Sequence, residues 1–416
     1  MITTLHIKNF KSLRDVRLKL GALNIFIGTN ASGKSNFLDA LRVLQGIGNG
    51  FTVSEIFDGK PQSATSERWE GIRGGSSQVT FRDKINEPVS FEVETETPKR
   101  PDHPKPGIES YKIAFDTYHL KVVNEQFKSG ASGYEFGPKP LHAKHFFRIF
   151  HSPPQFSGTN PQEESGPDLL SPYEQPALIR LLSLHYGQTA ASVQTTASRF
   201  ARSLANMQRI DPTPSVLRDY SRVQNVLRMG ERGENFAALI QKICDDPATK
   251  EAYLSWLKEL RPAEVDDVLT ITVPMVGDKI FALREGTRNF PAPVLSDGTL
   301  RFAAIAAAFF QPDMPGFLTI EEIENGIHAS RLRLLVELLG NRSLRPQTQV
   351  FITTHSPLVL DWLQEQDYAH TFLCKRDEKS GESKILPLTE IPRFNDIVKK
   401  QPVRDLFAEG WMEAAL

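Results

Sequence analysis

Cysteine is scarce in this chain: Cys244 and Cys374 are the two present among 416 residues, and they lack metal-ligand spacing. This usage fits a reducing cytosol, and we expect both thiols to be buried as small apolar side chains. Long apolar runs are also missing, since no stretch approaches the ~18 residues of a membrane helix. The N-terminus alternates polar and apolar residues and has no apolar signal core. We therefore expect a cytoplasmic protein without membrane contact.

An excess of charge of either sign is absent as well. Lys and Arg number 49 against 50 Asp and Glu, which gives a formal net charge of −1. No global positive field attracts nucleic acid, so DNA binding would have to rest on a local patch. Such a run is most often a solvated face, and direct DNA binding stays open. The basic stretches contain Lys8, Lys11, Arg14, Arg17 and Lys19 near the start, and Arg331, Arg333, Arg342 and Arg345 later.

Phosphate binding is indicated by residues 28–35, whose sequence GTNASGKS matches G-x-x-x-x-G-K-[ST]. An apolar run at 23–27 precedes the motif, and a helical pattern follows it that we expect to end near the glycines of 46–48. This is the strand–loop–helix context that the motif requires. The glycines let backbone N–H groups converge on an anion, and the helix adds its positive end. A chance match in a surface turn is the alternative. The expected nucleotide-binding residues are Gly28, Thr29, Asn30, Ala31, Ser32, Gly33, Lys34, Ser35 and Asn36.

Hydrophobic periodicity indicates an α/β protein. Alternation predicts strands at 2–8 and 16–20 and an antiparallel meander from about 78 to 124. Residues 128–172 are rich in Gly, Pro and Ser, and we expect long loops there. Uniformly apolar segments at 23–27, 316–320 and 349–354 predict strands buried on both faces of a parallel sheet. Helices are expected at 175–186, 194–207, 215–229, 235–244, 249–260, 295–310 and 328–339, with short strands at 268–273 and 279–284.

Acidic and imidazole side chains follow two of the buried strands. Glu321 and Glu322 come directly after 316–320, where carboxylates project from the sheet edge toward a ligand crevice. We expect Glu321 to hold Mg²⁺ directly or through water, and Glu322 to accept a proton from, or orient, the attacking water. His355 ends the next strand, where it would contact the γ-phosphate or hold the water. The structural alternatives are a solvated acidic strand end and a satisfied histidine.

A second anion-binding helix terminus is expected at Ser296, Asp297 and Gly298, where a capping serine opens an apolar helix. An ordinary capped helix is the alternative. Because one nucleotide already has its cradle at residues 28–35, this second terminus makes most sense facing the γ-phosphate of another protomer's nucleotide.

Together, the order of residues 28–35, 295–299, 317–322 and 354–355 resembles the Walker A, signature, Walker B and H-loop motifs of an ABC-type ATPase head. More narrowly, LHIKNFKSL at 5–13 is similar to the opening of RecF/SMC-like ATPases. Residues 295–302, 321–328 and 353–357 match bacterial predicted AAA-type ATPases of that group. The resemblance covers roughly 1–45 and 290–360. The departures are Glu321, where relatives often carry Asp, Ile323, where they often carry Pro, and Asp297 and Thr299, which replace the Gly and Gln of transporter heads.

The resemblance implies a P-loop NTPase fold: an ABC-type α/β head with a mixed sheet, an antiparallel β meander and an inserted helical lobe. Residues 1–127 would form the N-terminal half of the head, 128–285 a loop-rich helical insert or lid, and 286–416 the C-terminal half. It also implies ATP and Mg²⁺ as cofactors. The implied catalytic residues are Lys34, Glu322 and His355, and the implied metal ligands are Ser35 and Glu321. Two heads would sandwich two ATPs, with Ser296, Asp297 and Gly298 of one copy closing the nucleotide of the other.

Three functions stay open. The first is ATP hydrolysis in DNA repair or in defence against foreign DNA, and the second is a nucleotide-gated scaffold that regulates a separate effector. The third is the ATPase subunit of a membrane transporter, which the signature departures disfavour. No heptad run separates Lys34 from Ser296, so an SMC arm is not expected. About 60 residues follow His355, fewer than the ~100 of a typical domain, so any nuclease would come from a separate protein.

Overall fold

The computed structural model describes residues 1–62, 69–82, 84, 86–97, 107–130, 132–138, 145–151, 162–165, 174–178, 188–222, 225–261, 264–274 and 277–415. Residues 98–106 of the expected meander and most of the helix expected at 175–186 lie outside these residues. The chain forms two compact units, and each is described by itself. The first unit comprises Met1–Gly21, Thr29–Met207 and Cys374–Leu386; the second comprises Ala22–Gly28, Gln208–Leu373 and Pro387–Leu416.

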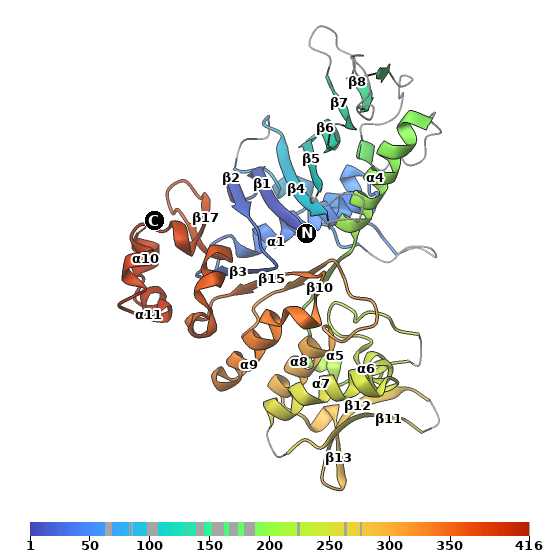
Figure 1. Cartoon of the computed structure of the whole chain (residues 1–416), viewed down its shortest axis with the longest axis vertical. Coiled ribbons are helices and arrows are strands. Elements are labelled where there is room, and N and C mark those ends of the chain that lie inside the picture. The colour runs from blue at the N-terminus through green and yellow to red at the C-terminus, as the bar shows by residue number, and fades with distance from the viewer. Residues whose placement is uncertain are drawn as a thin grey trace. The chain divides into compact units, whose positions relative to one another are not determined.

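An eight-stranded sheet organises the first unit, in the order β2-β1-β4-β5-β6-β7-β8-β9. Each neighbouring pair is antiparallel. Leu5 and Ile7 of β1 are fully buried and pair with buried Leu18 and Val16 of β2, as expected of a sheet with one covered face. Figure 1 shows these strands in blue to teal. The bounds are β1 Ile2–Phe10, β2 Leu13–Lys19, β4 Val89–Thr97, β5 Gly107–Asp116, β6 Lys121–Ser129, β7 Ser132–Pro138, β8 His145–His151 and β9 Gln162–Ser165.

The predicted meander is confirmed for β4, β5 and β6, but it starts later and continues further than expected. Val79 and Phe81 lie outside the strands, since a 3₁₀ turn, η1 (Ser76–Gln78), leads directly into them. The long loops expected within 128–172 are wrong for the described residues there, because β7, β8 and β9 extend the sheet. Tyr134 of β7 pairs with Phe127 of β6 and is buried, but the Gly and Ser residues around it obscured the alternation.

Two helices of the first unit pack closely against each other. α1 (Lys34–Gly48) starts in the phosphate motif and ends at the glycines predicted to stop it. α4 (Gln188–Ala205) lies against it, and a Cβ added at Gly48 would overlap the backbone N of Ala205. The lack of a side chain at Gly48 therefore sets how closely the two helices approach.

A parallel sheet organises the second unit. Its strand order within this unit is β10-β14-β15-β3-β16. The pairs β14–β15, β15–β3 and β3–β16 are parallel. Every residue of β14 and β15 is buried, which confirms the prediction of strands covered on both faces. The bounds are β3 Leu23–Ile27, β10 Met207–Ile210, β14 Phe317–Ile320, β15 Gln349–Thr354, β16 Thr371–Arg376 and β17 Ser383–Pro387.

Helices and a three-stranded sheet, β11-β12-β13, complete the second unit. The helix expected at 215–229 is wrong: among the residues described there, α5 (Pro214–Leu217) is the helical part. Side chains from other segments hold the backbone beyond it in an irregular path, since Met229 N–H donates to Gln311 Oε1 at 3.0 Å. The remaining bounds are α6 Phe236–Cys244, α7 Pro247–Leu260, β11 Asp267–Thr272, β12 Lys279–Glu285, β13 Arg288–Pro291, α8 Asp297–Ala307 and α9 Ala329–Gly340.

Short helices make up the other regular elements of the described residues. They are α2 Val53–Asp58, η2 Ala292–Val294, η3 Arg342–Leu344, η4 Pro357–Trp362, η5 Glu365–His370, η6 Leu388–Glu390, α10 Phe394–Ile397, α11 Val403–Ala408 and α12 Trp411–Ala414. Across the described ranges, no helix combines the length and apolar character that crossing a bilayer requires.

Candidate nucleotide-binding site

The phosphate loop is held by a polar network of the first unit. Gly33 adopts φ 107°, and a Cβ at this position would overlap the Ser383 hydroxyl of β17. Ser383 Oγ donates to Ser12 Oγ at 2.7 Å, and Asn36 Nδ2 donates to the same Ser12 oxygen at 2.7 Å. Ala31 also lies in the left-handed region, at φ 62°. The loop therefore has a tight turn that requires glycine, as the motif predicts.

Lys34 and Ser32 are the buried polar side chains of this loop. Lys34 is 6% exposed, and its Nζ donates to the Thr29 carbonyl at 2.8 Å. Ser32 is 2% exposed, and its hydroxyl is buried without a hydrogen-bond partner. An unsatisfied buried hydroxyl costs free energy, which a bound phosphate oxygen would recover. Both side chains fit an anion cradle.

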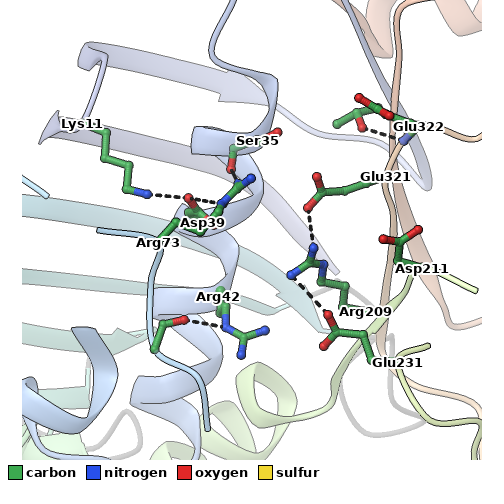
Figure 2. A network of polar contacts seen from close by, with 12 residues as sticks. Lys11, Ser35, Asp39, Arg42, Arg73, Arg209, Asp211, Glu231, Glu321 and Glu322 are labelled. Atoms are coloured by element: carbon green, nitrogen blue, oxygen red, sulfur yellow. Dashed lines mark hydrogen bonds and ion pairs between the residues drawn. The ribbon is translucent and has the colours of Figure 1, made fainter. Parts of the chain in front are cut away.

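Asp39 of α1 anchors two cations beside the loop (Figure 2). Lys11 Nζ lies 2.6 Å from Asp39 Oδ2, and Arg73 Nη2 lies 3.1 Å from Asp39 Oδ1. Burial lowers the pKa of Lys11, and the Asp39 carboxylate opposes that change. The same Arg73 nitrogen donates to the Ser35 carbonyl at 2.9 Å. Sequence reasoning treated Lys11 as one of a basic stretch and missed Asp39 and Arg73, because no spacing connects them.

The carboxyl ends of three parallel strands meet at one edge of the sheet in the second unit. Ile320 of β14 is in register with Ile352 of β15, and Ile352 is in register with Ile25 of β3. Thr354 is likewise paired with Ile27. The next residues along these strands are Glu321, His355 and Gly28. The predicted sheet-edge position of the acidic pair and the histidine is therefore confirmed.

Glu321 forms an ion pair that the sequence did not predict. Its Oε1 lies 3.1 Å from Arg209 Nη2, while Arg209 Nη1 lies 3.2 Å from Glu231 Oε1 (Figure 2). The side chain of Glu321 is 15% exposed. A half-buried carboxylate of this kind offers the oxygen ligand that Mg²⁺ prefers.

Glu322 stands in a strained turn. Its φ of 45° lies in the left-handed region, which costs a residue other than glycine about 1–3 kcal/mol. Its backbone N–H donates to Thr353 Oγ1 at 3.1 Å, and Arg301 donates to its carbonyl at 3.3 Å. The side chains of Thr353 and Arg301 thus hold the backbone of Glu322 at the end of the strand.

Glu324 is an acidic residue of this edge that sequence reasoning missed. Its Oε1 lies 2.9 Å from His355 Nδ1 and accepts backbone hydrogen bonds from His355 N–H at 2.7 Å and Ser356 N–H at 3.1 Å. Its Oε2 is buried without a hydrogen-bond partner. The sequence does contain a sign of this role, because Glu324 is a third acidic residue after the strand, two residues beyond Glu322. Glu324 orients the imidazole of His355, whose side chain is 48% exposed.

The expected second anion-binding terminus begins α8. Ser296 caps the helix, and its hydroxyl accepts from Thr299 N–H at 3.3 Å. Ser296 and Asp297 are exposed, and Asp297 pairs with Arg218. A Cβ at Gly298 would lie 2.6 Å from the Gly326 carbonyl, so the loop after Glu322 passes directly beside this glycine. The geometry is that of a capped helix with an accessible first turn.

The residue set fits Mg²⁺ and a triphosphate. Mg²⁺ takes hydroxyl and carboxylate oxygens together with phosphate and water oxygens, and the predicted ligands, Ser35 of the first unit and Glu321 of the second, are residues of these two kinds. Within the described residues, no group of three or more His, Cys, Asp or Glu side chains is arranged to hold a metal by itself. Nucleotide oxygens and water would therefore complete the coordination. For the nucleotide, the buried, unsatisfied Ser32 hydroxyl and the buried Lys34 ammonium supply the fit.

Comparisons with known proteins give the following similarities. A family model described as "AAA domain, putative AbiEii toxin, Type IV TA system" matches residues 23–361. A Helicobacter pylori protein named ATP/GTP phosphatase is 24% identical over 404 residues, which cover 91% of this chain and 94% of that one. An SMC head solved with the C-winged helix domain of ScpA has a TM-score of 0.45 and 13% identity, covering 92% of this chain and 96% of that one. The SMC head domain of Thermotoga maritima has a TM-score of 0.40 and 12% identity, covering 93% and 98%.

Proposed function

The chain belongs to the AAA domain family matched across residues 23–361, and from this premise we propose that it binds ATP with Mg²⁺ and hydrolyses it to ADP and phosphate. The observation that carries the proposal is the shared sheet edge, where Ile27 and Thr354, the residues before Gly28 and His355, are paired, and Ile320, the residue before Glu321, is paired with Ile352 of the same strand. The Helicobacter pylori relative, named ATP/GTP phosphatase, supports hydrolysis of a nucleoside triphosphate.

Each residue has a distinct task in this proposal. Backbone N–H groups of residues 28–35 and the Lys34 ammonium bind the phosphates. Ser35 and Glu321 hold Mg²⁺, which when bound neutralises charge on the β- and γ-phosphates. Asn36 tethers the loop through Ser12.

Hydrolysis needs a group that orients water. In this proposal Glu322, which lies just beyond the end of β14, accepts a hydrogen bond from the attacking water and takes its proton. His355, held by Glu324, donates to the γ-phosphate or to that water. A general base contributes about 10²- to 10⁴-fold to such a reaction.

ATP-dependent homodimerisation is the second part of the proposal. Ser296, Asp297 and Gly298 would contact the γ-phosphate of a second copy's nucleotide, closing two ATPs between two heads. The exposure of Ser296 and Asp297 in this protomer supports the assignment, since a helix terminus buried within one chain could not serve a partner. ATP then acts as a clamp whose hydrolysis reopens the pair.

Two biological uses fit this ATPase. The first is DNA repair or defence against foreign DNA, as the RecF/SMC-like motifs suggest. The second is nucleotide-gated regulation of a protein effector, which a specific observation favours: cations of the N-terminal basic stretch are ion-paired. The pairs are Lys8–Asp15, Lys11–Asp39, Arg14–Glu382 and Arg17–Glu94, at 3.6, 2.6, 3.8 and 3.8 Å. Paired cations offer less positive potential to a phosphate backbone.

The test is the ATPase rate of the purified protein, alone and with double- or single-stranded DNA. Glu322→Gln should lower the rate by about 100-fold or more, retain ATP binding and favour the dimer. Glu337→Gln is the matched control, since Glu337 is exposed and pairs with Arg333 on one face of α9. An unchanged rate in Glu322→Gln would remove Glu322 from the catalytic role. Stimulation by DNA supports the first use, and indifference to both DNA forms supports the second.

A further inference from the structure

The Arg209 guanidinium bridges two carboxylates at the end of β10 (Figure 2). Its Nη2 lies 3.1 Å from Glu321 Oε1, and its Nη1 lies 3.2 Å from Glu231 Oε1. The Arg209 and Glu231 side chains are 31% and 40% exposed, whereas Glu321 is 15% exposed. One arginine thus shares its charge between the expected metal ligand and a more exposed carboxylate.

The backbones on both sides of this arginine are fixed. Arg301 Nη2 donates to the Glu321 carbonyl at 3.1 Å, which holds the end of β14. The Asp211 N–H donates to the Glu231 carbonyl at 2.7 Å, which holds the segment of Glu231 beside the end of β10. The Asp211 carboxylate already accepts from Arg301 Nη1 at 3.1 Å. Rearrangement at this point therefore involves the side chains of Arg209, Glu231 and Glu321.

We propose that Arg209 is a positioning residue for Glu321 that competes with the metal: it holds the carboxylate before Mg²⁺–ATP binds and moves its charge to Glu231 afterwards. The inference rests on the proposed function. A guanidinium and Mg²⁺ are both positive, so they oppose each other at the same carboxylate oxygens. Glu231 already holds one nitrogen of Arg209 and, as a carboxylate, has several acceptor sites. The exchange therefore leaves Arg209 with a counter-ion throughout.

This arrangement sets the metal concentration at which the site loads. Removing Arg209 abolishes the competition, so less Mg²⁺ suffices. Neutralising Glu231 removes the alternative counter-ion, so Arg209 stays with Glu321 and more Mg²⁺ is needed. The two changes act on one ion network yet shift the metal requirement in opposite directions, whereas a merely structural role would shift both in the same direction.

The experiment measures binding of a fluorescent ATP analogue to the full chain at fixed nucleotide while Mg²⁺ is titrated. Arg209→Ala should lower the half-saturating Mg²⁺ concentration about two- to fivefold, the size expected of a partly exposed ion pair. Glu231→Gln should raise it by a similar factor. Arg261→Ala is the matched control, because Arg261 also contacts two carboxylates, Glu264 and Glu285, and should leave the midpoint unchanged.

The outcomes separate this inference from the proposed function. Opposite shifts in Arg209→Ala and Glu231→Gln support the exchange, provided that circular dichroism shows both variants to be folded. Shifts of the same sign, or no shift in either variant, overturn it while analogue binding by the wild type still supports a nucleotide site. No analogue binding by the wild type at any Mg²⁺ concentration overturns both.

Discussion

Replacing Arg301 with methionine should destabilise the second unit and slow hydrolysis together. Arg301 is 4% exposed on α8. Its Nη1 donates to Asp211 Oδ1 at 3.1 Å and to the Pro212 carbonyl at 2.8 Å, and its Nη2 donates to the Glu321 and Glu322 carbonyls at 3.1 and 3.3 Å. Methionine retains an unbranched stem but removes the charge and all these donors.

The expected loss of unfolding free energy follows from the ion pair and hydrogen bonds that those acceptors lose. Breaking a buried ion pair by removing one partner costs about 3–5 kcal/mol. The side chain of Asp211 is 43% exposed and can be rehydrated, so we expect about 3 kcal/mol for Arg301→Met. The hydrolysis rate should fall because the φ of Glu322 is strained and Arg301 helps to hold it. Displacing a catalytic carboxylate by about 1 Å lowers the rate roughly 100-fold.

Urea unfolding followed by circular dichroism, together with single-turnover hydrolysis, measures both effects. Arg301→Lys keeps a positive charge and some of the hydrogen bonds, so it should lie between wild type and Arg301→Met. Arg333→Met is the control: its side chain is 61% exposed and pairs with Glu337, so it should cost less than about 1 kcal/mol. An Arg301→Met variant within about 1 kcal/mol of wild type and with an unchanged rate would refute the reasoning.

Three further predictions follow from single positions. Lys34→Ala should weaken binding of a fluorescent ATP analogue about tenfold or more, because it removes a charged phosphate donor; undiminished affinity would argue against the cradle. Gly298→Ala should lower the unfolding free energy by about 1–3 kcal/mol, since the new Cβ would lie 2.6 Å from the Gly326 carbonyl, whereas Gly340→Ala meets nothing within 4 Å and should be tolerated. Burial raises the pKa of Glu125 above 4.5, so its contribution to stability is complete below pH 4.5 and is lost as pH rises through the folded value. Glu125→Gln should therefore flatten the pH dependence of the thermal midpoint, and an identical profile would contradict the assignment.

Local patterns predicted the longer helices and several of the strands. β3, β14 and β15 were predicted from uniformly apolar runs, and α1 from the motif at its start and the glycines at its end, because these signals lie within one segment. The prediction failed where local composition misleads. β7 and β8 lie in a Gly-, Pro- and Ser-rich stretch, and their pairing in the sheet overrides that composition. The helix expected at 215–229 is replaced by an irregular segment in which the Met229 carbonyl accepts from Gln208 and the Met229 N–H donates to Gln311, contacts that no local pattern reveals.

The residues of the site also fall into those that local sequence predicted and those that it did not. The phosphate loop, the Glu321–Glu322 pair and His355 were predicted because each follows a strand at a fixed spacing. Glu324 carried a weaker sign, a third acid after the same strand. Arg209 and Arg301 carried none, because their partners include residues that are distant in the sequence and lie in turns and irregular segments.

The sequence by itself determined the phosphate cradle at residues 28–35, the acids and histidine at strand ends, and hence the expectation of ATP and Mg²⁺. Each of these features lies within one short segment, whose residues determine both the local backbone conformation and the functional side chains. The tertiary structure alone decided that Arg209 bridges Glu321 and Glu231, that Arg301 holds the backbone of Glu321 and Glu322, and that Glu324 orients His355. Such contacts depend on strand order and register, and a shift of one residue in a strand would turn each side chain to the opposite face.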